Sequence, residues 1–218
     1  MYFASRMQAG RMLANQLVEK YRYENCAVVA INDGGVVVGA QIAMRLHCVL
    51  MLLASEEIDL PREIEAIGAI AQDGSFTYNN YYSQSEIDEL MGEYFGFVEQ
   101  EKLNRIQDLQ HLVGAGGILR KDLLKGRNII IVSDGFSNGF PLDIAFQYLK
   151  PVAIEKVVVA TPLASVAAVD RMHVLADDLV CLSVVADYIS TDHYYDKQDI
   201  PEHAKIIETI EKIILNWK

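Results

Sequence analysis

The chain has 218 residues, 51% of them hydrophobic, which is enough to bury a sizeable core and makes disorder unexpected. This length predicts a single domain over residues 1–218. The formal net charge of −11 argues against nucleic acids and anionic membrane surfaces as partners, although a small phosphorylated ligand needs only a favourable local site.

The first half of the chain alternates between helical and strand patterns. Ser5 can cap a helix, because apolar residues then recur at helical spacing along one face. A continuous apolar run typical of a buried strand follows, and Asn32-Asp33-Gly34-Gly35 breaks it. The elements expected here are a helix over Met7–Tyr21, a strand over Cys26–Ile31, a helix over Val36–Leu46, a strand over Cys48–Ala54, and a hairpin of Ile67–Ala71 with Phe76–Tyr78.

The second half begins with a long charged helix over Gln84–Val113, which ends at Gly114–Gly117, a stretch expected to form a mobile loop. The elements expected after it are strands over Ile129–Val132, Val157–Ala160 and Asp178–Val184, and helices from Asp143 onward, over Ser165–Leu175 and over Glu202–Trp217. Strands that alternate with helices predict an α/β fold. The apolar runs lack the alternation of a one-sided antiparallel sheet, so we expect their strands in one parallel sheet.

Residues 128–145, NIIIVSDGFSNGFPLDIA, form the strongest candidate for a functional site. An apolar strand there leads into Ser133-Asp134, then into a loop of small residues, then into a helix. Ligands bind outside the carboxyl ends of parallel strands, and a glycine-bearing loop that opens a helix directs backbone N–H groups at an anion. The stretch therefore predicts a phosphate-binding loop with a carboxylate beside it. An ordinary strand-to-helix turn with a loop-ordering aspartate remains the alternative.

The cysteines, Cys26, Cys48 and Cys181, lie in apolar runs and show no Cys-x-x-Cys spacing. We therefore expect buried, reduced thiols and a reducing compartment, the cytoplasm. The chain has no run of 18 apolar residues, and its first residues lack the apolar core of a secretory signal, so neither a membrane span nor export is expected. The histidines show no metal-ligand spacing, so no protein-bound metal is expected.

The 128–145 stretch resembles the phosphoribosyl diphosphate (PRPP) signature of the type I phosphoribosyltransferases, in which four apolar residues and two acids precede a small-residue loop. Segments that match one bacterial and archaeal group of this family, in order, are FASRMQAG at Phe3–Gly10, NDGG at Asn32–Gly35, IEAIGAIAQDG at Ile64–Gly74, ATPLA at Ala160–Ala164 and the late aromatic Tyr195. The resemblance implies a Rossmann-like parallel core with a small hood and a flexible loop. It also implies transfer of ribose 5-phosphate from Mg²⁺-PRPP to a nitrogen acceptor.

The resemblance also implies roles for individual residues. Asp134 matches the second acid of the signature, which lies near the ribose hydroxyls and the reacting centre, and is the implied catalytic residue. The positions that match PRPP-binding residues are Ser133, Gly135, Ser137, Asn138 and Gly139 on the 5′-phosphate side and Asp33, Gly34 and Gly35 on the pyrophosphate side.

Several positions depart from the family pattern toward negative charge. Asp33 stands where the group usually has Arg, Glu56-Glu57 stand where it tends to have Arg-Lys, and Ser133 replaces the first acid. Like charges about 5 Å apart repel by roughly 3 kcal/mol at an effective dielectric of 20, so these acids should weaken the binding of a diphosphate. Asn138 and Pro141 also replace hydroxyl residues in the loop.

Two functional hypotheses follow. The first is a phosphoribosyltransferase that uses Mg²⁺-PRPP, for which Lys121, Lys125 or Arg105 would have to bring positive charge to the site. The second is a non-catalytic relative that binds a small phosphorylated ligand, such as ribose 5-phosphate or a nucleotide, for regulation or assembly. The aromatic runs Tyr78–Tyr82 and Tyr94–Phe97 could line a pocket, but they more often pack in a core or between subunits, and we expect a homodimer.

Overall fold

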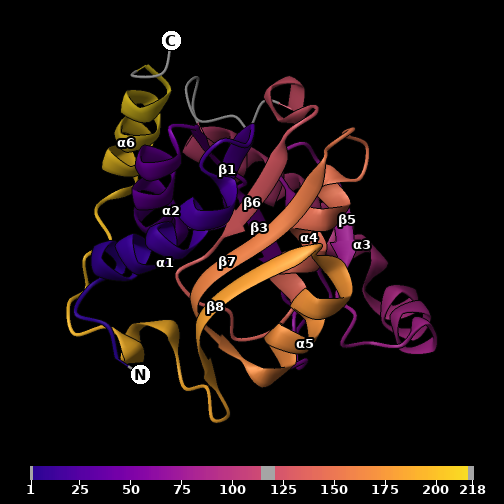
Figure 1. Ribbon diagram of the computed structural model, residues 1–218. Helices are drawn as coiled ribbons and strands as arrows, with labels where there is room; N and C mark the ends of the chain where they lie inside the picture. The colour runs from indigo at the N-terminus through magenta and orange to yellow at the C-terminus, as the bar shows by residue number, and fades with distance from the viewer. Residues whose placement is uncertain (1, 114–120, 216–218) are drawn as a thin grey trace.

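The centre of the molecule is a parallel sheet with strand order β2-β1-β6-β7-β8 (Figure 1). Its strands are β1 (Cys26–Ala30), β2 (Val49–Leu52), β6 (Asn128–Val132), β7 (Lys156–Ser165) and β8 (Asp178–Val185). β1 and β6 are buried along their whole length, which explains their continuous apolar runs. The predicted α/β fold with these five strands in one parallel sheet is confirmed.

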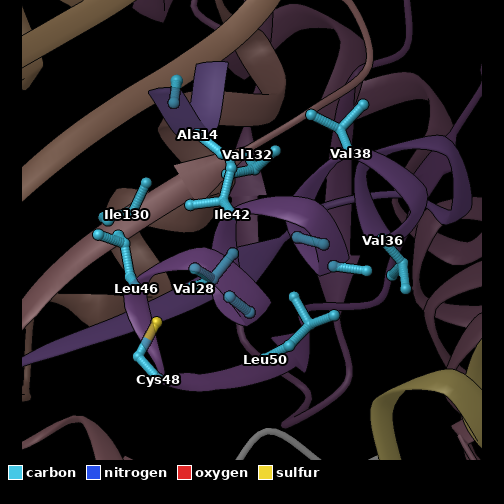
Figure 2. Packing of buried hydrophobic residues seen from close by; sticks show 14 of the residues in the cluster. Ala14, Val28, Val36, Val38, Ile42, Leu46, Cys48, Leu50, Ile130 and Val132 are labelled. Carbon is cyan, nitrogen blue, oxygen red and sulfur yellow. The ribbon is translucent and has the colours of Figure 1, made fainter. Parts of the chain in front are cut away.

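Helices cover both faces of this sheet in the computed structural model, which describes residues 2–113 and 121–215 (Figure 1). One face carries α1 (Arg6–Tyr21), α2 (Asp33–Leu46) and α6 (His203–Leu215), and the other carries α4 (Phe140–Leu149) and α5 (Val166–Leu175). Figure 2 shows the first face, where Ile42 and Leu46 of α2 pack among Val28, Ile130 and Leu50 of the sheet. The two apolar layers fix the strand ends that carry the site.

A second, antiparallel sheet stands beside the first. It contains β3 (Ser55–Ile58), β4 (Gly68–Ala71) and β5 (Phe76–Tyr78) in that order, and α3 (Gln84–Val113) packs against it. The hairpin expected from the sequence is β4 and β5. The strand β3 was not predicted, because Glu56 and Glu57 occupy half of it and glutamate is depleted in strands. The expected mobile loop at Gly114–Gly117 lies outside the described residues.

Three element boundaries differ from the sequence-based expectations by three residues or more. α2 begins at Asp33 instead of Val36, because the Asn32 side chain accepts a hydrogen bond from the Gly35 N–H and caps the helix earlier. α4 begins at Phe140 instead of Asp143, because Pro141 is compatible with the first turn of a helix. β7 runs on to Ser165, five residues past its expected end at Ala160, where the Ser165 side chain caps α5.

The first residues of the chain meet the segment that follows β8. Phe3 forms an isolated parallel bridge with Tyr195, through hydrogen bonds to Tyr194 and Asp196. Tyr195 belongs to residues 186–202, called here the 186–202 segment, which joins β8 to α6 and contains a short 3-10 helix, η2 (Thr191–Tyr194). Because the rings of Phe3, Tyr194 and Tyr195 are buried together, the segment is packed against the body of the protein.

All three cysteines are free thiols, as expected from their spacing. Burial raises the pKa of Cys26 to about 11 and that of Cys48 to about 12, so both stay protonated and unreactive near neutral pH. No helix within the described residues is both long enough and apolar enough to cross a membrane.

Candidate functional site

A cleft of about 450 Å³ opens at the carboxyl edge of the parallel sheet, beyond β1 and β6. The chain leaves β1 through α2 on one face and leaves β6 through α4 on the other, so this is the point where the topology reverses and ligands bind in open α/β sheets. The lining residues are Ile31, Asn32, Ser55, Glu56, Glu57, Ser133, Gly135, Phe136, Ser137, Pro141, Ile144 and Thr191.

Asp134 follows β6 directly, yet its side chain is withdrawn from solvent. The residue is 3% exposed and is not among those that line the cleft. Its Oδ2 accepts a 2.6 Å hydrogen bond from Arg6 Nε, and its Oδ1 accepts a 2.8 Å hydrogen bond from Asn32 Nδ2. Both carboxylate oxygens are therefore engaged by protein groups, where the resemblance implied a carboxylate that faces a ribose.

Arg6 is the partner that neutralises this carboxylate. It is 1% exposed, and its guanidinium also donates to Asp192 and lies 4.4 Å from the ring centroid of Tyr195. Burial opposes the charge of Arg6, but hydrogen bonds and attraction from Asp134, and then from Asp192, outweigh burial and raise the pKa of Arg6 above its ordinary value. The guanidinium therefore stays charged at any pH at which the protein is folded.

The glycine pair in the first turn of α2 allows this helix to reach Asp134. A Cβ atom on Gly34 would lie 2.1 Å from Asp134 Oδ2, and one on Gly35 would lie 2.7 Å from the Val132 carbonyl oxygen. The positive end of the α2 dipole consequently faces the carboxylate. Gly34 and Gly35 thus lie in the first turn of a helix rather than in a separate turn, and close packing explains why glycine stands there.

Asp33 turns away from this edge. Its carboxylate lies 3.0 Å from Nδ1 of His203 on α6, and the residue does not line the cleft. The structure therefore does not place the Asp33 charge where the sequence analysis expected it, opposite a diphosphate.

The loop after β6 offers backbone donors. The N–H groups of Ser137, Asn138 and Gly139 have no acceptor among the described residues. The Asn138 side chain accepts a 3.0 Å hydrogen bond from the Phe140 N–H and so holds the loop in shape at the start of α4. Successive unpaired amides at a helix N-terminus form the kind of nest that binds phosphate.

The structure divides the residues predicted on the 5′-phosphate side between two hollows, and those predicted on the pyrophosphate side line neither. Ser133, Gly135 and Ser137 line the cleft, whereas Asn138 and Gly139 line a neighbouring hollow of about 220 Å³. Ser133 is 1% exposed, and its hydroxyl donates to the Gly135 carbonyl at 2.9 Å, so it shapes the loop instead of replacing an acid. The loop thus presents one face to each hollow.

The charge of the cleft comes from β3. Glu56 and Glu57 are its charged lining residues, and no lysine or arginine of the described chain lines it. Partial desolvation, followed by repulsion from Asp59, Glu65 and Glu56, raises the pKa of Glu57 above its ordinary value, although the residue is exposed.

The basic residues that the sequence analysis suggested as sources of positive charge do not line the cleft. Lys121 Nζ lies 2.6 Å from Asp73 and sits over the Tyr148 ring, and Arg105 pairs with Glu101 along α3. Lys125 is exposed and is likewise absent from the cleft lining. Within the described residues, the cleft therefore remains acidic on its β3 side.

The sequence analysis quoted Arg6, Asn32 and Tyr195 in matching segments but did not select them as site residues. One signal could have singled out Arg6. An arginine in the first turn of a helix opposes the helix dipole, so it needs an acidic partner from elsewhere in the fold. The identity of that partner, 128 positions away, required the structure.

Comparison with known proteins identifies a family whose model matches the chain. A family model described as the phosphoribosyl transferase domain matches residues 3–199. Two Mycobacterium tuberculosis proteins that carry the name phosphoribosyl transferase are 28% identical over 197 residues, which is 88% of this chain and 43% of theirs. The chain thus spans less than half the length of these curated relatives. The crystal structure of TT1426 from Thermus thermophilus is similar at a TM-score of 0.72 and 26% identity, covering 100% of this chain and 99% of that one.

Proposed function

The chain belongs to the phosphoribosyl transferase domain family, and on this premise we propose that its cleft binds a ligand with a phosphorylated ribose, such as ribose 5-phosphate or a nucleoside monophosphate. The loop after β6 binds the phosphate through backbone amides, and Ser137 lines the cleft and has an N–H group without an acceptor among the described residues. The sugar extends toward the ends of β1 and β6. Phosphoribosyl transfer from PRPP is a weak activity of this site or is absent from it.

The observation that carries this proposal is the contrast in charge within the cleft. Asp134 is buried and paired with Arg6, so it does not repel a phosphate at the loop. Glu56 and Glu57 are exposed enough to act on a ligand and have no basic neighbour in the described lining. A single phosphate at the loop avoids them, whereas a diphosphate that extends toward β3 meets two like charges.

Mg²⁺, which accompanies PRPP in this family, fits only part of the site. It prefers octahedral oxygen coordination, usually from one or two carboxylates plus substrate phosphates. Glu56 and Glu57 could supply such carboxylates, whereas both oxygens of Asp134 are engaged. No group of three or more His, Cys, Asp or Glu residues in the described chain could hold a metal ion. Any Mg²⁺ would therefore rest on Glu56, Glu57 and the phosphates of the ligand together.

Transfer from Mg²⁺-PRPP to a nitrogen acceptor is the second candidate function. The position of Glu56 and Glu57 favours it in one respect, because a metal ion between them and a diphosphate would convert repulsion into attraction. The residue that would stabilise positive charge on the ribose is less favourable. The Asp134 carboxylate already interacts with the Arg6 guanidinium, is buried and does not line the cleft, so it is not presented to a substrate.

A matched pair of variants tests the phosphate loop. Ser137→Pro removes a backbone N–H, whereas Ser137→Ala removes only the hydroxyl and keeps that donor. We expect Ser137→Pro to weaken ribose 5-phosphate binding roughly fivefold, because an amide at a helix N-terminus contributes about 1 kcal/mol toward an anion, and Ser137→Ala to leave it nearly unchanged. Isothermal titration calorimetry measures both, with circular dichroism to confirm folding.

Two results of this experiment would overturn the proposal. One is wild-type protein that binds neither ribose 5-phosphate nor adenosine monophosphate at millimolar concentration. The other is a folded Ser137→Pro protein with wild-type affinity, which would show that the amide of Ser137 is not used.

A further inference from the structure

The guanidinium of Arg6 joins three parts of the molecule that are far apart in sequence. Its Nε donates to Asp134 at the end of β6, and its other nitrogens donate to Asp192 and, at 3.3 Å, to Gln198. Asp192 and Gln198 both belong to the 186–202 segment. Arg6 is therefore a buried link between the site acid and the chain that follows β8.

Further contacts hold the same segment at the same place. Asp199 accepts hydrogen bonds from the backbone N–H groups of Arg6 and Met7 at the start of α1. The Tyr195 ring lies over the Arg6 guanidinium, and its hydroxyl donates a 2.6 Å hydrogen bond to the backbone oxygen of Asp134. Arg6 and Tyr195 thus hold the segment against Asp134.

The 186–202 segment forms part of the cleft wall. Thr191 lines the cleft, and the Tyr188 hydroxyl donates to or accepts from Thr191 Oγ1 at 2.7 Å. A Cβ atom on Gly135 would lie 2.6 Å from the Tyr188 oxygen and 2.9 Å from Thr191 Cγ2, so these side chains press directly on the loop after β6. The shape of the loop depends on the segment being in place.

The charges of the segment make Arg6 necessary for this arrangement. Asp187, Asp192, Asp196 and Asp199 all lie in the segment, and the protein as a whole carries a formal net charge of −11. Asp134, Asp192 and Asp199 surround one guanidinium. Without that cation, three carboxylates would face one another in a partly buried space, and their repulsion would push the segment away.

We propose that Arg6 is a positioning residue of the ligand cleft: it fastens the 186–202 segment to Asp134 and so places Tyr188 and Thr191 against the phosphate loop. Arg6 itself is buried and does not line the cleft. The inference rests on the proposed function, because the loop is taken to bind phosphate. It goes beyond that function because it makes the shape of one part of the cleft depend on the charge of a single buried arginine.

Limited proteolysis with trypsin tests the link without any ligand. Lys197 is exposed in the segment, and cleavage after it requires the segment to leave the body of the protein. We expect Arg6→Gln to accelerate this cut at least tenfold and Arg6→Lys, which keeps one positive charge, to accelerate it less. Arg11→Gln is the matched control, because Arg11 is exposed on the same helix and bonds to Gln41, away from the segment.

Two further readouts separate positioning from a general loss of stability. The double variant Arg6→Gln/Asp192→Asn removes one of the repelling carboxylates and should slow the cut relative to Arg6→Gln. Ribose 5-phosphate affinity, measured by calorimetry, should fall about tenfold in Arg6→Gln and recover partly in Arg6→Lys. If Arg6→Gln does not fold, Asp192→Asn alone provides the test. The Asp192 side chain is 63% exposed, so this variant should still speed the cut several-fold without lowering global stability.

The proposal is overturned if a folded Arg6→Gln protein is cut after Lys197 at the wild-type rate, or if Arg11→Gln accelerates the cut as strongly. A wild-type protein that binds neither ribose 5-phosphate nor adenosine monophosphate would refute the proposed function instead, and the proteolysis rates would still decide whether Arg6 holds the segment.

Discussion

Two groups of carboxylates stand at the same edge of the parallel sheet and differ in how their charge is compensated. Asp134 is 3% exposed, with one oxygen on Arg6 and the other on Asn32. Glu56 and Glu57 lie on β3 at the opposite wall of the cleft and have no basic partner in the described lining. A carboxylate that is buried with a partner thus stabilises the fold, whereas carboxylates without a partner at the cleft are placed to act on the charge of a ligand.

This comparison explains how an acidic protein can offer a phosphate site. A buried ion pair presents little net charge to the cleft, so the loop amides can attract a phosphate. Uncompensated carboxylates at the far wall set a limit on how much negative charge a ligand can carry in that direction. Each of the following predictions concerns a change either at the paired carboxylate, Asp134, or at the unpaired carboxylates of β3.

The largest effect is expected for Asp134→Ala. It leaves the buried Arg6 guanidinium without its most buried partner, and breaking such a pair costs about 3–5 kcal/mol of the free energy of unfolding. Urea denaturation measures this loss. Asp33→Ala is the control, because the pair that Asp33 forms with His203 is partly exposed and should contribute less than about 1 kcal/mol. Equal losses in the two variants would contradict the distinction.

The next effect concerns the approach of α2 to Asp134. Gly34→Ala would place a methyl group on the buried carboxylate and should cost about 1–3 kcal/mol of stability through overpacking. Gly92→Ala on α3 meets nothing within 4 Å and should stabilise by about 1 kcal/mol through helix propensity. Thermal unfolding of both proteins checks the signs. A stabilising Gly34→Ala would show that the carboxylate moves aside easily.

A smaller effect is expected at the other wall. Glu56→Gln/Glu57→Gln removes two negative charges from the lining of the cleft, and we expect PRPP affinity to rise about tenfold at low salt and much less at high salt. Calorimetry at two salt concentrations measures the change. Glu19→Gln, on the exposed side of α1, changes the net charge without touching the cleft and should have little effect. No gain in the double variant would mean that the diphosphate does not approach β3.

The smallest effect is a dependence of stability on pH. The pKa of Glu57 is raised in the folded protein, so the folded state binds this proton more tightly than the unfolded state. Its charge therefore destabilises the fold above the raised pKa, and this penalty disappears as the pH falls through that pKa toward the ordinary glutamate range near about 4.3. The difference in unfolding free energy between Glu57→Gln and wild type should shrink as the pH is lowered from neutral toward about 4, the ordinary glutamate range. A constant difference would contradict the shift.

Much of the fold could be predicted from the sequence because its signals are local. The apolar runs of β1, β6 and β7 reveal buried parallel strands, and Ser5 marks the start of α1. The glycine-bearing loop after β6 was likewise visible as a candidate phosphate site. The strand β3 was missed, since its glutamates pair with β4 in a small second sheet that no local pattern indicates.

The electrostatics of the site could not be predicted, because each decisive partner is distant in sequence. Arg6 and Asp134 are 128 positions apart, and Asp33 and His203 are 170 apart. The sequence analysis therefore placed the Asp33 charge in the cleft and left Asp134 free for a ligand. The structure assigns the first carboxylate to α6 and the second to Arg6, whereas Glu56 and Glu57 line the cleft.

The central claim is that the cleft accepts a phosphorylated ribose but disfavours the diphosphate of PRPP. Calorimetric titration of the unmodified protein with ribose 5-phosphate and with Mg²⁺-PRPP, in one buffer at low salt, tests it most directly. The account predicts tighter binding of ribose 5-phosphate than of Mg²⁺-PRPP. Binding of Mg²⁺-PRPP at low micromolar Kd, with release of pyrophosphate when a purine or pyrimidine base is added, would contradict it and identify the site as an ordinary phosphoribosyltransferase centre.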